Sequence, residues 1–437
     1  MGNSIVTPAV ANGASAGGAK STVSAARFAL LATPLIGATF LSKFAFPPFG
    51  ALGIDISVFL VLAALMVGSV ADCVRIEPRR LTLFALMICC LGLMQIFQPG
   101  AFSPTSLLLL VAVHLPYVFT VPHSNDGERI IKFFIQIVTV FALLGIAQYG
   151  LQFVVNVRYL FPIENFVPGT FIVQNFNHQA AMEYGSHEYR ANGVFLLEPS
   201  FFSQVLAVAM VAELCTLGRL TRLAIFGLAL VVSYSGTGII VLAICLPLCL
   251  VSQRRWGLLL LGLIGLIAII ALHEFFHVGR LFSRIDEFTS IRSSGYGRFV
   301  GGFYLFDRFL WPDPWRTLFG YGAGSFIGHA AHDGIAGEMA LFKIVFEFGL
   351  LGAVAYFGFL FACLLYSPTP RLLTLAVGIT YLMNGIYIPF AHGLALSLLL
   401  WNSPNALGRR TVWLDGLNRK RPFGNSVATM LVPKLGN

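Results

Sequence analysis

Residues 131–155 read IKFFIQIVTVFALLGIAQYGLQFVV, a stretch in which Lys132 is the only charged side chain. A helix of this length crosses the hydrocarbon core of a bilayer, which is about 30 Å thick. Apolar runs of similar length recur along nearly the whole chain, and no alternating barrel-type pattern competes with them. Because a helix satisfies its own backbone hydrogen bonds in lipid, the sequence predicts an all-α, polytopic integral membrane protein.

The composition of the 437-residue chain supports this prediction. Hydrophobic residues make up 57% of the chain and charged residues only 11%, whereas soluble domains carry about 25% charged residues. The net charge of +9 does not indicate nucleic-acid binding, because the basic residues form short clusters between the apolar runs. Such clusters are typical of loops that stay on the cytoplasmic side of a membrane.

The apolar runs predict about twelve transmembrane helices within residues 27–401. Residues 1–26, rich in Gly, Ala and Ser, are expected to form a disordered cytoplasmic tail, and residues 402–437 a basic cytoplasmic tail. The expected spans are about 27–45, 51–71, 81–98, 106–122, 131–155, 194–216, 221–235, 237–252, 256–274 and 339–366, with two short spans in 371–401.

Loop charges predict the orientation of these spans. With residues 371–401 split into two, all the short basic clusters fall on one side, which the positive-inside rule makes cytoplasmic. Two long loops, about 156–193 and 275–338, then face the periplasm. The second loop nevertheless carries six arginines, and their density indicates an anionic ligand at the membrane surface. These are Arg280, Arg284, Arg292, Arg298, Arg308 and Arg316.

A carboxylate stands where the first long loop re-enters the membrane. The chain reads Arg190-Ala-Asn-Gly193 and then Leu197-Glu198-Pro-Ser-Phe-Phe202. An ionised carboxylate near the end of a span is unfavourable without a partner. Glu198 could therefore brace the loop through Arg190, or it could act directly in binding or proton transfer.

Two further elements suit an anionic ligand. The turn around Ser235, between two short apolar spans, could donate backbone amides to a phosphate, although a tight structural turn explains it equally well. In the second long loop, Ser293-Ser-Gly-Tyr-Gly-Arg298 places a guanidinium after a glycine-rich segment. The planar fork of arginine is suited to bidentate phosphate binding.

Two histidines follow before the next span, at His329 and His332. A histidine near neutral pKa can take or give a proton, but a histidine that packs within a loop would look the same. Although His329, His332 and Asp333 could imitate a metal cluster, their spacing does not supply a third suitable ligand, so no metal site is predicted. Lys343 and Glu347, one helical turn apart in the next span, are expected to form an intrahelical pair.

Taken in order, these motifs resemble those of the bacterial polysaccharide polymerase and O-antigen ligase family, the Wzy-type membrane glycosyltransferases. The resemblance covers roughly residues 130–365 and also includes Gly320-Tyr-Gly-Ala-Gly324 and Glu347-Phe-Gly-Leu-Leu-Gly352. The Glu-Pro-Ser-Phe-Phe element is most similar to exopolysaccharide polymerases. One departure is Gly236, where family members often carry an arginine.

The resemblance implies polymerisation of undecaprenyl-diphosphate-linked oligosaccharide repeats into exopolysaccharide or O-antigen, at the periplasmic face of the bacterial inner membrane. The lipid diphosphate leaves, an acceptor hydroxyl attacks, and neither a nucleotide sugar nor a cofactor is used. Partners would be the lipid-linked glycan, the bilayer and a chain-length regulator. An O-antigen ligase or a lipid-linked oligosaccharide transporter remains an alternative, although a transporter would predict internal repeats.

The resemblance also assigns roles to individual residues. Arg298 would bind the diphosphate, and Arg190 would support the donor or the loop. Glu198 or His332 would orient or deprotonate the acceptor hydroxyl. The remaining candidates for substrate binding are Arg284, Ser235 and His329.

Overall fold

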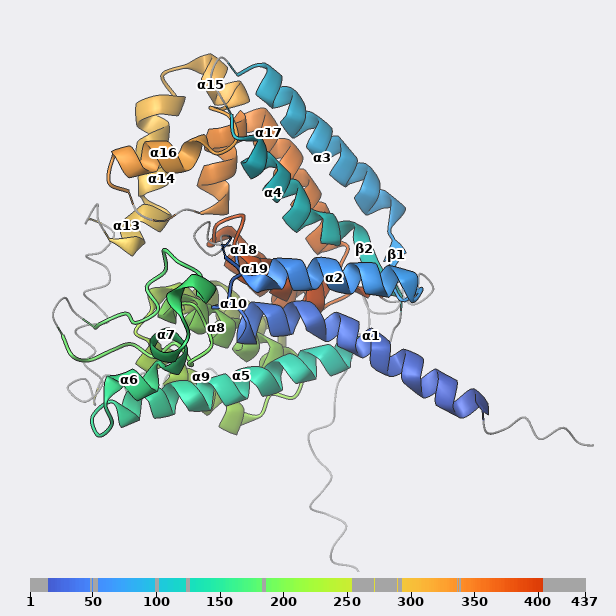
Figure 1. Cartoon of the computed structure of the whole chain (residues 1–437), viewed down its shortest axis with the longest axis vertical. Coiled ribbons are helices and arrows are strands. Elements are labelled where there is room, and N and C mark those ends of the chain that lie inside the picture. The colour runs from blue at the N-terminus through green and yellow to red at the C-terminus, as the bar shows by residue number, and fades with distance from the viewer. Residues whose placement is uncertain are drawn as a thin grey trace, which may run out of the picture.

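The structure of the chain is a computed structural model (Figure 1). It describes residues 15–47, 49, 54–98, 102–122, 126–182, 186–253, 271, 289, 293–335, 337 and 339–403. The expected span at 256–274, the arginines at 280, 284 and 292, and the tail after residue 403 therefore lie outside the described residues, apart from residue 271.

Each expected span within the described residues coincides with a helix, and the all-α fold class is confirmed. Of the helices described, α3, α5 and α17 are long and apolar enough to cross a membrane, and eight others, α1 among them, contain shorter apolar stretches. The helices are α1 (Ser15–Phe40), α2 (Ile56–Val70), α3 (Pro78–Ile96), α4 (Pro104–His114), α5 (Asp126–Leu151), α8 (Pro199–Cys215), α9 (Leu220–Ser233), α10 (Gly236–Gln253), α17 (Ala340–Leu365), α18 (Arg371–Leu382) and α19 (Pro389–Ala395). The 3₁₀ turn η2 (Leu115–Val118) extends α4, and the π-helical turn η6 (Leu396–Leu400) extends α19.

The segments expected to be loops or tails contain further helical structure. Helix α1 begins at Ser15, within the stretch 1–26 for which the sequence predicts a disordered tail, so the helix starts earlier than the expected span at about residue 27. The first long loop contains α6 (Val157–Leu160), α7 (Pro162–Phe166) and the 3₁₀ turn η3 (Gly169–Phe171). The second contains α13 (Ser294–Phe299), α14 (Gly301–Leu305), the π-helical turn η5 (Phe306–Leu310), α15 (Pro314–Phe319) and α16 (Ser325–His332).

Helix α8 lies at the centre of one half of the molecule, packed against α5, α9, α10 and α18. It is buried on nearly all sides, as expected for an apolar helix surrounded by others. In the other half, α17 packs along α3, and Figure 1 shows these two helices side by side with α13 to α16 beyond them. Helices α18 and α19 lie between the two halves.

Helix α17 is interrupted at Gly349, whose φ of 68° is a left-handed conformation that favours glycine. The Gly320-Tyr321-Gly322 segment docks at this break: Tyr321 N–H donates to Phe346 O (2.9 Å) and Gly322 N–H to Glu347 O (2.8 Å). A Cβ at Gly320 would collide with the backbone around Glu347. The GxG motif thus fastens the second long loop to α17, which is a structural use of these glycines.

A small sheet gathers three distant segments. Strand β1 (Arg75–Ile76) pairs antiparallel with β2 (Phe119–Pro122), and β2 pairs in parallel with β3 (Asn402–Ser403). Arg80 donates from Nη1 to Phe119 O (3.2 Å) and to Leu400 O (2.9 Å) nearby. The loops after α2, after α4 and after η6 therefore meet at one end of the molecule.

The two long loops lie at the opposite end. A bridge joins Phe44, after α1, to Ile172 in the first loop. Ser103 N–H, before α4, donates to Ala323 O in the second (2.8 Å). In Figure 1 the labels of β1 and β2 lie on the right of the view, and those of α6 and α13 lie on the left.

Candidate functional site

A cavity of about 310 Å³ opens at the end of the molecule that carries the long loops. This volume is within the range of small-molecule sites. Its walls come from the first loop, the start of α8, the turn between α9 and α10, and α13. Four residues singled out from the sequence line it together: Arg190, Glu198, Ser235 and Arg298.

Glu198 is the residue before α8, where Pro199 takes the first helical position. Proline is favoured there because its fixed φ suits the helix and its missing N–H would be unpaired anyway. The carboxylate of Glu198 accepts three hydrogen bonds. Oε1 accepts from Asn177 N–H (2.8 Å), and Oε2 accepts from Ser200 Oγ–H (3.0 Å) and from Arg298 Nη2 (3.2 Å).

Arg298 reaches Glu198 from the short helix α13. The hydroxyl of Ser293 caps this helix by accepting the Tyr296 N–H (3.0 Å). The Arg298 guanidinium lies over the Phe201 ring, 6.0 Å from its centroid. Side-chain exposure is 12% for Arg298 and 16% for Glu198, so this ion pair is mostly buried but remains open to the cavity.

Arg190 contributes a second cation to the cavity wall. Its Nη2 donates to Met182 O (3.0 Å), whereas its buried Nε–H meets no acceptor among the described residues. Burial lowers the pKa of Arg190 to about 10, and the nearby charge of Glu198 partly offsets this effect. Arg190 therefore remains protonated at neutral pH, with an unused donor that an anionic ligand could satisfy.

Gln148 of α5 holds the Arg190-Ala-Asn-Gly element in place. Its Oε1 accepts the Asn192 N–H (3.0 Å) and its Nε2 donates to Asn192 Oδ1 (3.1 Å). Asn192 Nδ2 in turn donates to His178 O (2.8 Å). Sequence reasoning missed Gln148, although a buried amide within an apolar span is a signal that the helix packs against a polar partner.

The turn between α9 and α10 forms the floor of the cavity. The hydroxyls of Ser203, Ser235 and Thr237 lie 3.0 to 3.1 Å from one another. Ser235 therefore uses its side chain within the protein, which favours the structural interpretation of this turn. At Gly236, by contrast, a Cβ would meet no atom within 4 Å, so the position where family members often carry an arginine is open.

Both candidate histidines lie outside the cavity lining. The His329 ring packs among Phe309, Tyr321 and Phe346, and its Nδ1 lies 2.9 Å from Ser325 O. The His332 side chain is 77% exposed and contacts Asp333. The structure thus brings Arg190, Glu198, Ser235 and Arg298 together and leaves His329 and His332 apart. The seventh candidate, Arg284, lies outside the described residues.

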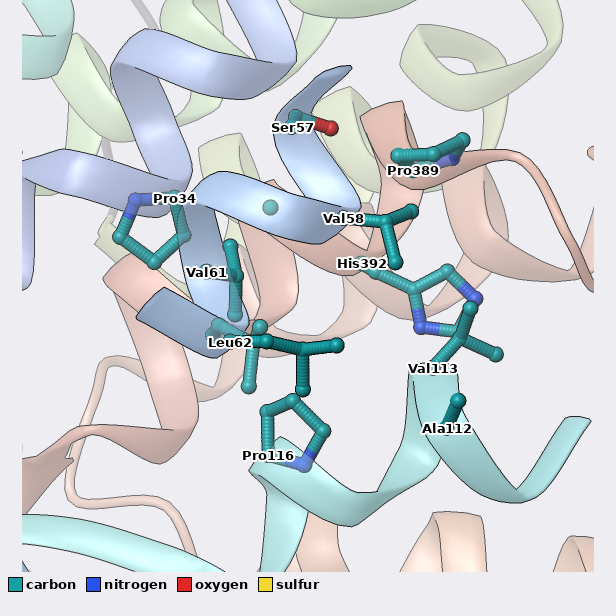
Figure 2. A pocket seen from close by; sticks show the side chains of 12 residues that line it. Pro34, Ser57, Val58, Val61, Leu62, Ala112, Val113, Pro116, Pro389 and His392 are labelled. Carbon is teal, nitrogen blue, oxygen red and sulfur yellow. The ribbon is translucent and has the colours of Figure 1, made fainter. Parts of the chain in front are cut away.

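Figure 2 shows a second, smaller crevice among α1, α2, α4 and α19. Its walls are mostly apolar, and the ring of His392 is the titratable group that lines it. That ring is already engaged, because Nδ1 lies 2.9 Å from Tyr117 Oη and Nε2 lies 2.8 Å from Ile386 O. With no cation in its lining, this crevice does not suit an anionic ligand.

The larger cavity thus combines two guanidinium groups with one carboxylate. Among the described residues, no group of three or more His, Cys, Asp or Glu side chains could hold a metal ion. Asn177 and Phe201, which contact Glu198 and Arg298, had no role assigned from the sequence. No protein-family model and no curated protein matches this chain.

Proposed function

We propose that this chain is a membrane glycosyltransferase that polymerises undecaprenyl-diphosphate-linked oligosaccharide repeats at the periplasmic face of the bacterial inner membrane. The observation that carries the proposal is the convergence of Arg190, Glu198 and Arg298 on one cavity. Arg190 and Glu198 come from one stretch of sequence and Arg298 from another about a hundred positions later, and both stretches resemble motifs of the polymerase and ligase family.

The cavity offers the chemistry that this transfer requires. The acceptor hydroxyl forms a bond to the anomeric carbon while the bond from that carbon to the diphosphate oxygen breaks. Arg298 and Arg190 neutralise the charge of the departing diphosphate, and one such electrostatic contact contributes on the order of 3 kcal/mol. The proton of the acceptor hydroxyl passes to a base, and Glu198 is the carboxylate in the cavity lining.

We assign the role of base to Glu198 rather than to His332. Glu198 lies beside both arginines, whereas His332 lies on the surface outside the cavity. A base must come within hydrogen-bond reach of the proton that it accepts. His332 would have to move into the cavity to meet this requirement.

The orientation of α8 supports a periplasmic location for the cavity. Helix α8 starts at the cavity and ends near Arg219 and Arg222, where Glu213 accepts from Arg219 N–H (2.9 Å) and Arg222 Nη1 (3.3 Å). The β1–β2–β3 sheet joins loops that the charge rule assigns to the cytoplasm. Reporter fusions after Ser294 and after Gly424 test this orientation: a periplasmic reporter is expected to be active only at Ser294, and activity at Gly424 would contradict it.

Replacement of Arg298 tests the function. Arg298→Ala is expected to abolish polymer while the protein remains inserted, with single-repeat lipid-linked glycan accumulating on the outer leaflet. The matched control is Arg308→Ala in the same loop, since Arg308 pairs with Asp333 on the surface and does not line the cavity. Polymer should be unchanged in this control.

Two other results would redirect the proposal. Accumulation of the lipid-linked repeat on the cytoplasmic leaflet would indicate a transporter. Normal polymer length together with loss of glycan transfer to another acceptor would indicate a ligase. Normal polymer from Arg298→Ala, with transfer to other acceptors also unchanged, would refute the assignment of this cavity.

A further inference from the structure

The cation best placed for a diphosphate is already occupied. Arg298 Nη2 donates to Glu198 Oε2 at 3.2 Å, and this pair stands in the cavity wall. The same Oε2 also accepts from Ser200 Oγ–H (3.0 Å), while Oε1 accepts from Asn177 N–H (2.8 Å). These three donors occupy most of the roughly four acceptor positions of the carboxylate, so Glu198 has little room to accept a hydrogen bond from a substrate hydroxyl.

We infer that the Arg298–Glu198 ion pair is a latch that the anionic leaving group of the donor opens. The diphosphate draws the guanidinium away from Glu198, and the same movement frees Oε2 to accept the proton of the acceptor hydroxyl. This inference rests on the proposed function and adds an order of events to it. The lipid-linked glycan binds first, and Glu198 becomes available as the base only when the diphosphate leaving group is bound.

Three features of the site favour this exchange. Arginine carries five N–H donors in a fixed fork, and a diphosphate can take two of them at once where Glu198 takes one. Gly295 and Gly297 flank Tyr296 in α13, and glycine allows the backbone next to Arg298 more conformational freedom than other residues would. Arg190, whose charge interacts with that of Glu198, remains beside the carboxylate when Arg298 leaves.

The latch predicts that Glu198 competes with the ligand for Arg298. The full-length protein in lipid nanodiscs would be titrated with geranyl diphosphate, a short isoprenyl diphosphate, by calorimetry. Glu198→Gln keeps the size of the side chain but removes its charge. It should bind geranyl diphosphate about tenfold more tightly than wild type, a change of about 1.4 kcal/mol in binding free energy, because the ligand no longer has to displace a charged carboxylate from Arg298.

A double-mutant cycle separates a latch from simple repulsion between Glu198 and the ligand. If Glu198 acts by holding Arg298, the gain from Glu198→Gln disappears in the Arg298→Ala background. If it only repels the anion, the gain persists there. Glu188→Gln, in the same loop but outside the cavity lining, is the matched control for loss of a negative charge and should leave the affinity unchanged.

The outcomes are distinct. A tighter complex with Glu198→Gln that depends on Arg298 supports the latch. Wild-type binding without that gain, or a gain independent of Arg298, overturns the latch and leaves the proposed function standing. If neither wild type nor Glu198→Gln binds geranyl diphosphate, the proposed function fails. Should Glu198→Gln not fold, Glu198→Asp replaces it, because a shorter carboxylate also loosens the pair and should tighten binding in the same direction.

Discussion

Two carboxylate–cation pairs in this protein have similar separations and different surroundings. Lys343 and Glu347 lie 3.4 Å apart on α17, as the sequence predicts, and both side chains are fully buried. Arg298 and Glu198 lie 3.2 Å apart, come from separate segments, and face a cavity. Neither residue of the first pair lines the cavity or the smaller crevice described above, whereas both residues of the second line the cavity. Access to a cavity, more than charge or distance, distinguishes a candidate site from a structural pair.

The neighbours of the two pairs reinforce this difference. The ammonium of Lys343 lies 5.0 Å from the Tyr387 ring centroid, and Glu347 Oε1 accepts the Phe326 N–H (3.3 Å). This pair therefore ties α17 to α16 and to the segment before α19. At the cavity, the Nε–H of Arg190 has no acceptor among the described residues, so the site retains a donor that the protein itself does not use.

The largest effect is expected from breaking the buried Lys343–Glu347 pair. Lys343→Met leaves Glu347 charged and buried without this cation, which costs about 3 to 5 kcal/mol. The yield of folded protein and its Tm in detergent should fall sharply. Adding Glu347→Gln should restore part of the loss, because no net charge is then left buried. Unchanged stability in Lys343→Met would show that this pair is not structural.

Neutralising the cavity carboxylate is expected to have a large effect of a different kind. Glu198→Gln should slow polymerisation by about 10²- to 10⁴-fold, the usual contribution of a general base, while the Tm stays close to that of wild type. The measurement is polymer formation from lipid-linked repeats in proteoliposomes. A fall in Tm alongside the loss of activity would show that Glu198, like Glu347, stabilises the fold.

A conservative change at the cavity arginine should have an intermediate effect. Arg298→Lys keeps the charge but lacks the planar fork. Losing one charge-assisted hydrogen bond of about 1.5 kcal/mol corresponds to roughly tenfold slower polymer formation. Activity equal to that of wild type would indicate that Arg298 acts only as a point charge.

The smallest effect is expected from a substitution at Gly236, in the turn between α9 and α10. Gly236→Arg places a side chain where a Cβ meets no atom within 4 Å, so the Tm should change little. Because the added guanidinium can reach the cavity that Gly236 lines, binding of geranyl diphosphate should tighten a few-fold, by about 1 kcal/mol. Weaker binding would mean that the diphosphate lies away from this turn.

Much of the fold follows from local pattern. Apolar runs such as residues 131–155 coincide with helices because a span must satisfy its backbone within itself. The break in α17 at Gly349 could not be read in this way, since it depends on a loop that docks from outside the helix. The three short strands were also missed, because two to four residues carry no recognisable alternation.

The candidate site was accessible from the sequence only in part. Residue chemistry and motif order singled out Arg190, Glu198 and Arg298, but nothing in the sequence placed Arg298 against Glu198, a contact between residues a hundred positions apart. The spacing of residues in the sequence also does not show that His332 lies on the surface and outside the cavity. Contacts of this kind are set by how the long loops fold over the helix ends.

The β1–β2–β3 sheet has a consequence for biosynthesis. Strand β2 and its first partner β1 are made early, yet its second partner β3 follows the last of the described helical turns, η6, and Val121 N–H donates to Trp401 O (3.1 Å) beside that pairing. The indole of Trp401 also donates to Pro116 O (3.0 Å). One edge of β2 therefore stays without its partner strand until residues 402–403 have been synthesised, and a chain that stopped short of Trp401 would leave that edge exposed.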